Sequence, residues 1–178
     1  MGVESPRRAL LFGRFQPFHR GHLAITKWAL ERGFDEIVFL IGMASENYTP
    51  RNPFTAGERI EMIRLSFKDE GIPLDKAITA TIMTLETSIG SVYYVLSYVP
   101  RVEAILTRNP VIAKIFIDAG IKTIQPPLFK REEWRGEVIR AKIARGDETW
   151  KDSVTRSTAE FIEEIGGVER IRWSSSRD

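Results

Sequence analysis

Short apolar runs alternate along the chain with longer segments in which apolar residues recur every three or four positions. Ala9 to Phe12 form an uninterrupted apolar run before Gly13, and Ile37 to Ile41 form a second one. Such runs are typical of strands buried on both faces of a parallel sheet. Together with one alternating segment and two shorter runs, they predict strands at 9–12, 36–42, 77–83, 104–107 and 122–124.

Helical spacing and capping residues predict the elements between these strands. Thr55 and Glu58 have the spacing of a capping box, so a helix is expected to begin there. Asn109 followed by Pro110 has the pattern of an N-cap and a first helical residue. A turn is expected at Ser88–Gly90. The predicted helices lie at about 20–30, 55–70, 92–96, 109–120, 135–146 and 157–165.

Strands that alternate with helices favour an α/β fold with a single doubly wound, Rossmann-like parallel sheet and helices on both faces. The length of 178 residues suits one domain over 1–178. We see no internal repeat or low-complexity tract. Residues 1–7 and 174–178 are expected to be flexible ends.

Composition narrows the functional classes. The chain has 26 Lys and Arg residues against 24 Asp and Glu residues, and it lacks a basic block, which argues against a nucleic-acid partner. The absence of cysteine excludes a disulfide framework. The longest apolar run, Ile37 to Ala44, is too short to cross a membrane, and Met1 to Arg8 lacks a signal-peptide pattern. We therefore expect a cytoplasmic protein without a membrane partner.

The two histidines of the chain, His19 and His22, both fall in one turn at the start of the first predicted helix. A helix start offers unpaired N–H groups and the positive end of the dipole, and Gly21 leaves room for a phosphate close to the backbone. Two alternatives to phosphate binding exist for these histidines. The histidines could be a cap and a packing residue, or they could bind zinc, although no cysteine is present and a third ligand would have to be an unmarked carboxylate.

Three segments carry a family resemblance. They are Gly13–His22, which contains the pattern His-x-Gly-His, Asn52–Arg59 and Gly166–Arg170. The first resembles the signature of the nucleotidylyltransferase superfamily. All three in this order resemble archaeal nicotinamide-nucleotide adenylyltransferases, over about residues 8–172. The resemblance implies the expected fold, and an enzyme whose ligands are ATP, nicotinamide mononucleotide and NAD.

The activity that the resemblance implies is attack of a mononucleotide 5′-phosphate on the α-phosphorus of ATP, without a covalent intermediate. Mg²⁺ is the implied cofactor, held mainly by ATP and water rather than by protein side chains. A homo-oligomer is implied as well. The preference between the amidated and the acid mononucleotide stays open.

The same resemblance implies roles for individual residues. The catalytic residues would be His19, His22 and Arg14. The residues that bind ATP or its phosphates would be Gly13, Phe15, Gly21, Arg51, Asn109, Arg135, Gly136 and Arg140. The residues that bind the mononucleotide would be Ser45, Leu85, Ser88 and Tyr93.

Two departures from the family pattern raise specific hypotheses. Relatives have a Ser-Gly-Thr-x-x-Arg-like segment where this chain has Arg135-Gly-Glu-Val-Ile-Arg140. We expect Arg135 to replace the lost hydroxyl contacts, and Glu137 to pair with Arg140 or to face Mg²⁺. Relatives also have a tryptophan that stacks on nicotinamide, in a segment where this chain has Thr84, Ser88 and Ser91. Tyr93 or Tyr94 could supply an aromatic face instead, or could pack in the core.

Other functions are compatible with these residues. The acceptor could differ, as in pantetheine-phosphate adenylyltransferases or cytidylyltransferases. The chain could also be a nucleotide sensor that kept the fold and lost turnover. An RNA-binding module is disfavoured, because the chain lacks a basic stripe with interleaved aromatic residues.

Overall fold

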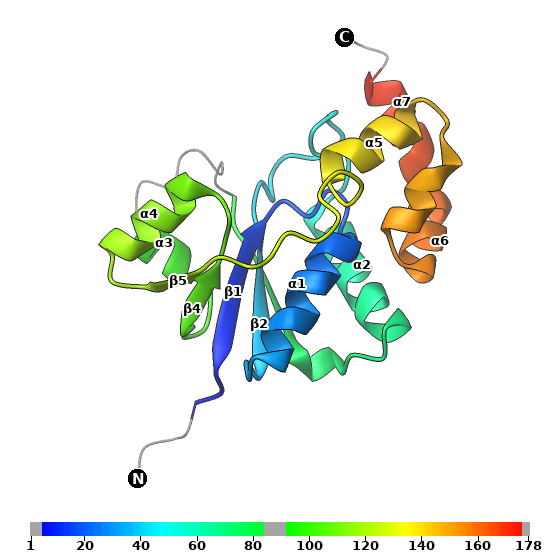
Figure 1. Cartoon of the computed structure of the whole chain (residues 1–178). Helices are drawn as coiled ribbons and strands as arrows, with labels where there is room; N and C mark the ends of the chain where they lie inside the picture. Colours follow the sequence, from blue (N-terminus) through cyan, green and yellow to red (C-terminus); the bar gives the residue numbers. More distant parts are fainter. Residues whose placement is uncertain (1–4, 84–91, 176–178) are drawn as a thin grey trace.

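The computed structural model describes residues 5–83 and 92–175, and within these ranges the predicted strands form one parallel sheet (Figure 1). The strand order is β3-β2-β1-β4-β5. Each predicted strand is present to within two residues at either end. The strands are β1 (Arg8–Gly13), β2 (Glu36–Ile41), β3 (Ala77–Thr81), β4 (Ala104–Leu106) and β5 (Lys122–Ile124).

Strand β1 lies at the centre of the sheet and pairs with β2 on one edge and β4 on the other. The chain winds outward from β1 to β3 and then returns to β4 and β5 on the opposite side. This reversal separates the connections that leave the carboxyl ends of β1 and β4, which is where open α/β sheets bind ligands. The predicted doubly wound fold is confirmed.

Helices cover both faces of the sheet (Figure 1). Alternate strand residues point to opposite faces, so Leu11 and Phe39 share a core with α1 and α2, whereas Leu10 and Val38 pack with α3 and α4. The helices are α1 (Arg20–Glu31), α2 (Ala56–Asp69), α3 (Val92–Leu96), α4 (Pro110–Asp118), α5 (Gly136–Ala144), α6 (Arg156–Glu164) and α7 (Gly167–Ser175), with short 3₁₀ helices η1 (Leu74–Lys76) and η3 (Glu148–Ser153).

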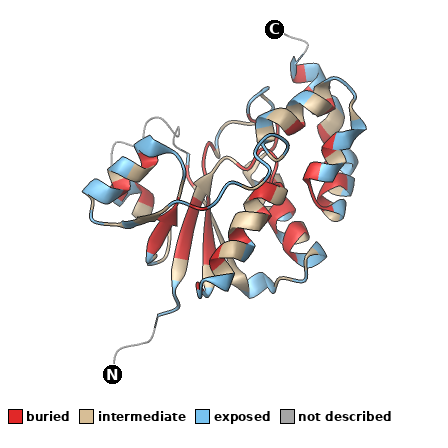
Figure 2. Ribbon diagram, viewed as in Figure 1, coloured by how far each residue is buried: buried red, intermediate tan, exposed pale blue. Residues whose placement is uncertain are grey.

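Buried residues lie mainly in the sheet and on the helix sides that face it (Figure 2). The central strands are buried along most of their length, and the exposed residues lie on the outer sides of the helices. No helix among the described residues is both long and apolar enough to cross a bilayer.

The predicted helix caps are present. Thr55 accepts a hydrogen bond from the Glu58 N–H, and the Glu58 carboxylate accepts one from the Thr55 N–H, so both halves of the capping box form. Asn109 caps α4 through hydrogen bonds from the N–H groups of Val111 and Ile112, with Pro110 next to it. The expected turn at Ser88–Gly90 lies outside the described residues.

Residues near both ends of the chain take part in regular structure or in hydrogen bonds. Helix α7 was not predicted, yet it extends to Ser175, and the buried Ser174 donates to the Ile171 carbonyl. Gly167 allows α7 to pack closely against α6, because a Cβ on Gly167 would lie 2.8 Å from the Ile162 carbonyl oxygen. At the other end, Arg7 is held by hydrogen bonds to Glu103 and Gly33. Residues 1–4 and 176–178 lie outside the described residues.

Helix α7 is attached to the start of α2 by a partly buried ion pair. Arg170 donates to both carboxylate oxygens of Glu58, at 2.7 and 3.0 Å, and also to the Pro53 carbonyl at 3.0 Å. Its guanidinium lies 4.5 Å from the centre of the Tyr48 ring. This contact joins Asn52–Arg59 and Gly166–Arg170, two of the three segments that carry the family resemblance.

We expect Arg170→Met to lower the free energy of unfolding by about 3 kcal/mol, because it leaves the Glu58 carboxylate without its partner in a poorly solvated place. Arg156→Met is the matched control. The Arg156–Glu160 pair is largely exposed, with 88% and 60% of the two side chains accessible, so its loss should cost less than about 1 kcal/mol. Urea unfolding of both variants measures the difference, and equal losses would contradict the structural role of Arg170.

Candidate active site

Two adjoining cavities open near the carboxyl ends of β1 and β4. The first, here called the larger cavity, has a volume of about 350 Å³ and reaches from β4 to the 126–135 connection. The second, here called the arginine cavity, has a volume of about 290 Å³ and is lined by Arg14, Arg135 and Arg140 among others. The residues shared by both walls are Gly13, Phe15, His19, His22, Arg135 and Gly136.

The two histidines form a capping box at the start of α1. The Nδ1 atom of His19 accepts a hydrogen bond from the Gly21 N–H at 3.1 Å, and the Nδ1 atom of His22 accepts one from the His19 N–H at 3.2 Å. The two rings are stacked with their centres 3.6 Å apart. Since each neutral imidazole accepts at Nδ1, its proton is on Nε2, and each ring keeps one Nε2–H donor for a ligand.

Both imidazoles are held neutral. Burial lowers the pKa of His19 to about 3, with a smaller contribution from the positive charge of Arg140. Burial and the nearby His19 lower the pKa of His22 well below its usual value. Phe18 stacks on His22 at 5.2 Å, and Phe15 meets it edge-on at 4.9 Å. The rings are therefore positioned hydrogen-bond donors rather than cations at neutral pH.

The start of α1 differs from the expectation of open N–H groups. The His19 ring already takes the Gly21 N–H, so the histidine Nε2–H groups take the place of free backbone donors there. The start of α5, by contrast, has no side-chain cap, and Gly136 lies in the wall of both cavities. A helix start of this kind suits an anion.

Two glycines allow these helix starts to approach each other. A Cβ on Gly21 would lie 3.0 Å from the Trp134 carbonyl oxygen. A Cβ on Gly136 would lie 2.9 Å from the Gln16 carbonyl oxygen and 3.0 Å from Nη1 of Arg140. A larger residue at Gly21 would push the start of α1 away from Trp134, and one at Gly136 would push the start of α5 away from Gln16. Either change would open the site.

Positive charge gathers on one side of the histidines. Arg140 donates to the Gln16 carbonyl at 2.6 Å. Burial lowers the pKa of Arg140 to about 10, with further lowering by the charges of Arg14 and Arg51. Arg51 is exposed and is not in the wall of either cavity, yet its charge reaches Arg140. The arrangement favours an anion with several negative charges.

The expected Glu137–Arg140 pair does not form. The Glu137 carboxylate accepts a hydrogen bond from Arg135 at 3.4 Å, and Arg140 is directed to the Gln16 carbonyl. The i, i+3 spacing was compatible with the predicted pair, but the buried carbonyl needs a donor and the exposed Glu137 does not need a partner. Arg135 nevertheless lines both cavities, as its expected phosphate role requires.

Several predicted residues are not in the wall of either cavity. Asn109 caps α4 and is in the wall of neither cavity. Ser45 is exposed, and Tyr93 and Tyr94 are 76% and 45% exposed, so neither tyrosine packs in the core. The predicted residues Leu85 and Ser88 lie outside the described residues.

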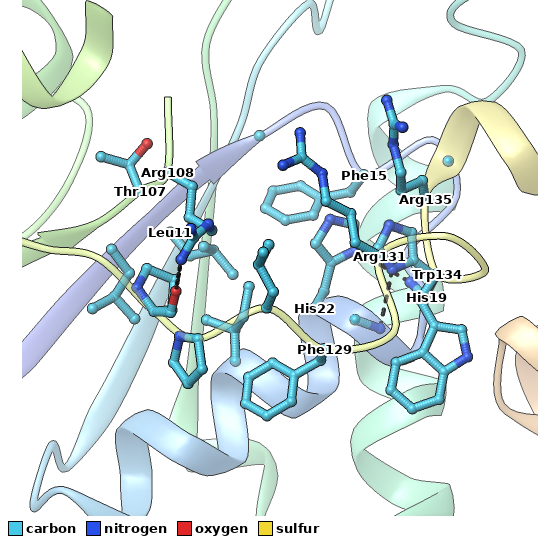
Figure 3. A pocket seen from close by; sticks show the side chains of 18 of the residues that line it. Leu11, Phe15, His19, His22, Thr107, Arg108, Phe129, Arg131, Trp134 and Arg135 are labelled. Carbon is cyan, nitrogen blue, oxygen red and sulfur yellow. Dashed lines mark hydrogen bonds between the residues drawn. The ribbon is translucent and has the colours of Figure 1, made fainter. Parts of the chain in front are cut away.

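The connection that closes the larger cavity was not expected from the sequence. Residues 126–135 cross the start of α1 without a helix or strand of their own, and they contribute Phe129, Arg131 and Trp134. In Figure 3, Arg131 and Arg135 lie on the same side of this cavity as the histidines, opposite Thr107 and Arg108. Basic and aromatic residues together, directly after the last strand, were the signal that could have revealed this wall.

Gln16 was also missed. Its side-chain amide donates to the Phe54 carbonyl at 2.9 Å and accepts from the Phe54 N–H at 3.0 Å. This pair of hydrogen bonds joins the segment that contains the histidines to the segment Asn52–Arg59. A polar residue of this kind, buried to 97%, is recognisable only when its backbone partner is known.

Within 5–83 and 92–175, no three His, Asp or Glu side chains gather into a metal site. Glu137 is the carboxylate in the wall of the arginine cavity among the described residues, and it is paired with Arg135.

The chain is similar to known proteins over most of its length. Residues 10–163 match the family described as cytidylyltransferase-like. An uncharacterized protein of Aeropyrum pernix is 78% identical over 96% of this chain and 99% of its own length. The nicotinamide-nucleotide adenylyltransferase of Ignicoccus hospitalis is 46% identical over 96% of this chain and 99% of its own length.

Among solved structures, a bifunctional NMN adenylyltransferase/ADP ribose pyrophosphatase of Francisella tularensis, complexed with AMP and a manganese ion, has the same fold. The TM-score is 0.73 at 19% identity, and the match covers 97% of this chain. This chain spans about half of that one, 52%.

The neutral state of His19 predicts a specific pH dependence of stability. The unfolded chain binds a proton at an ordinary histidine pKa of about 6.5, whereas folded His19 binds one only near 3, so the contribution to stability is complete above about 6.5 and falls as the pH drops. Between pH 6.5 and 5 we expect a loss of about 2 kcal/mol from this residue. His19→Asn keeps a capping acceptor and should lack this loss. Urea unfolding of both proteins from pH 7.5 to 5 measures the difference, and parallel curves would contradict the assignment.

Proposed function

The chain belongs to the cytidylyltransferase-like family, in the group that contains the archaeal nicotinamide-nucleotide adenylyltransferases, and we propose that it transfers the adenylyl group of ATP to nicotinamide mononucleotide. The observation that carries this proposal is the stacked pair of neutral histidines between the larger cavity and the arginine cavity. The names of its relatives support the same activity.

In the proposed reaction, an oxygen of the mononucleotide 5′-phosphate attacks the α-phosphorus of ATP. A new P–O bond forms, the bond between the α-phosphorus and the bridging oxygen breaks, and pyrophosphate leaves with that electron pair. The products are NAD and pyrophosphate. This direct transfer needs no enzyme nucleophile, so catalysis consists of alignment and stabilisation of growing negative charge.

The two cavities suit the two halves of ATP. The larger cavity has apolar and aromatic walls, including Leu11, Phe129 and Trp134, which suit a planar base. The arginine cavity would hold the phosphates that leave. The histidine Nε2–H groups lie between them, where they would donate to the α-phosphate. Neutral donors suit this position, because their N–H groups stabilise growing negative charge through hydrogen bonds and the stacked rings already hold them in place.

Charge neutralisation would come from three arginines and a metal ion. Arg14, Arg135 and Arg140 surround the arginine cavity. Mg²⁺ bound to the phosphate oxygens would withdraw charge from the leaving group. The manganese ion in the Francisella structure supports a divalent cation in this family.

The decisive experiment incubates the protein with ATP, Mg²⁺ and separate acceptors, and measures release of pyrophosphate. Nicotinamide mononucleotide, its nicotinic acid counterpart, pantetheine phosphate and a no-acceptor control form the panel. Rapid release with a pyridine mononucleotide is expected. Release with pantetheine phosphate alone would refute the proposed acceptor, and release with none would refute the transferase.

We expect His22→Ala to lower turnover about 10²- to 10³-fold, because one donor to the α-phosphate is lost. His22→Gln is the matched variant, since its side-chain amide can still donate, and it should recover part of the loss. Thermal melting of both variants separates this role from a structural one. Near-normal turnover in His22→Ala would show that the ring does not act on the phosphate.

Arg135→Ala should weaken binding of MgATP about tenfold and leave mononucleotide binding nearly unchanged, because a charged hydrogen bond to phosphate is lost. Arg145→Ala is the control, since Arg145 follows the same helix but pairs with Asp147 outside both cavities. Titration calorimetry at fixed ionic strength gives both dissociation constants.

The hydroxyl pattern of relatives provides a second check on Arg135. Arg135→Ser combined with Glu137→Thr should retain most of the activity, because the hydroxyls can donate to the same phosphate. If Arg135→Ala binds MgATP like the parent, Arg135 is a solvated surface charge and the idea of compensation is wrong.

A further inference from the structure

Arg59 is an arginine of α2 with no accessible surface. Its guanidinium donates to four backbone carbonyl oxygens: from Nε to Thr55 at 3.1 Å, from Nη1 to Arg14 at 2.9 Å and to Gly42 at 2.7 Å, and from Nη2 to Met43 at 3.2 Å. Burial of a charge is costly, so a residue used only for packing would be better replaced by an apolar one.

Three of these carbonyls lie just beyond the ends of two neighbouring strands. β1 ends at Gly13, directly before Arg14, and β2 ends at Ile41, directly before Gly42. The planar fork of the guanidinium therefore joins the two chain segments that leave the sheet on the ligand side. A lysine has a single donor atom at its tip and could not reach all of these acceptors.

The joined segments have unusual backbone conformations. Phe15 has φ of 52° and Met43 has φ of 54°, and neither residue is glycine. Such conformations cost free energy and persist only where surrounding contacts hold them. The hydrogen bonds from Arg59 to the Arg14 and Met43 carbonyls hold the backbone at these two positions.

The turn at Arg14 determines where its side chain begins. Arg14 is in the wall of the arginine cavity, beside His19, His22 and Arg140. The charge of Arg14 lowers the pKa of both Arg59 and Arg140, which places the three guanidinium groups within electrostatic reach of one another. Burial, the larger cause, lowers the pKa of Arg59 to about 10, so Arg59 is still charged at neutral pH.

We propose that Arg59 is a positioning residue for the reaction: by holding the Arg14, Gly42 and Met43 carbonyls in one fork, it directs the Arg14 guanidinium toward the phosphates of ATP. Arg59 does not contact the substrate and acts through Arg14. This inference rests on the proposed function for the reaction that it assists, and on the geometry alone for the coupling between the two arginines.

The test is a double-variant cycle between Arg14→Ala and Arg59→Lys, with turnover of ATP and nicotinamide mononucleotide as the readout. In the parent, Arg59→Lys should lower kcat about tenfold and change the KM of the mononucleotide by less than about threefold. In the Arg14→Ala background, Arg59→Lys should change kcat by less than about twofold, because the side chain that it directs is gone. Equal losses in both backgrounds would overturn the proposal.

A stability control separates positioning from folding. Met62 lies on the same helix and is also fully buried, but its side chain is part of the apolar core. Met62→Ala should lower the melting temperature and leave kcat within about twofold of the parent, when all proteins are assayed well below their melting temperatures. If Met62→Ala loses as much turnover as Arg59→Lys, reduced stability explains both and the proposal fails.

A binding measurement keeps the test independent of the reaction. Titration with inorganic pyrophosphate should show about tenfold weaker binding for Arg59→Lys in the parent and no further weakening in Arg14→Ala. Arg59→Gln takes the place of the lysine variant should that variant not fold. If the parent forms no dinucleotide, the proposed function fails, while this second cycle still supports or overturns the role of Arg59.

Discussion

Buried backbone carbonyls at the carboxyl ends of the central strands need hydrogen-bond donors, and this requirement connects the site to the rest of the structure. The donors are side chains from distant segments: Arg59 for the Arg14, Gly42 and Met43 carbonyls, Arg140 for Gln16, and Arg170 for Pro53. An unpaired buried carbonyl would cost about as much as a lost hydrogen bond. Among these residues, the donor Arg140 and the carbonyl-bearing Arg14 and Gln16 line the arginine cavity, so the same hydrogen bonds hold part of its wall.

Charge is distributed unevenly although the formal net charge is only +2. Arginines surround the arginine cavity, and the two histidines beside it stay neutral because burial and neighbouring positive charge disfavour protonation. The site thus combines fixed cations with neutral donors. This combination would suit a polyphosphate in the proposed reaction, since the cations would balance its charge and the neutral N–H groups would donate hydrogen bonds to it.

Short-range patterns in the sequence were sufficient to predict the fold and part of the site. Apolar runs and one alternating segment predicted the five strands of the described residues, and the capping residues Thr55 and Asn109 marked helix starts, because these signals act over a few residues. The spacing of His19 and His22 placed both rings on one turn for the same reason. Helix α7 was missed because its packing depends on a close approach of Gly167 to Ile162, a contact that local periodicity does not report.

The sequence by itself determined the alternation of strands and helices, the doubly wound class, and the position of His19 and His22 in one turn. These features depend on short-range sequence pattern and backbone preference. Only the tertiary structure decided which distant groups meet. In the tertiary structure Glu137 pairs with Arg135 instead of Arg140, and Trp134 lies against the start of α1. Arg59 donates to carbonyls just beyond the ends of two strands. These contacts form because each buried donor and acceptor needs a hydrogen-bond partner. Such a partner can belong to a segment that is distant in the sequence, so only the tertiary structure identifies it.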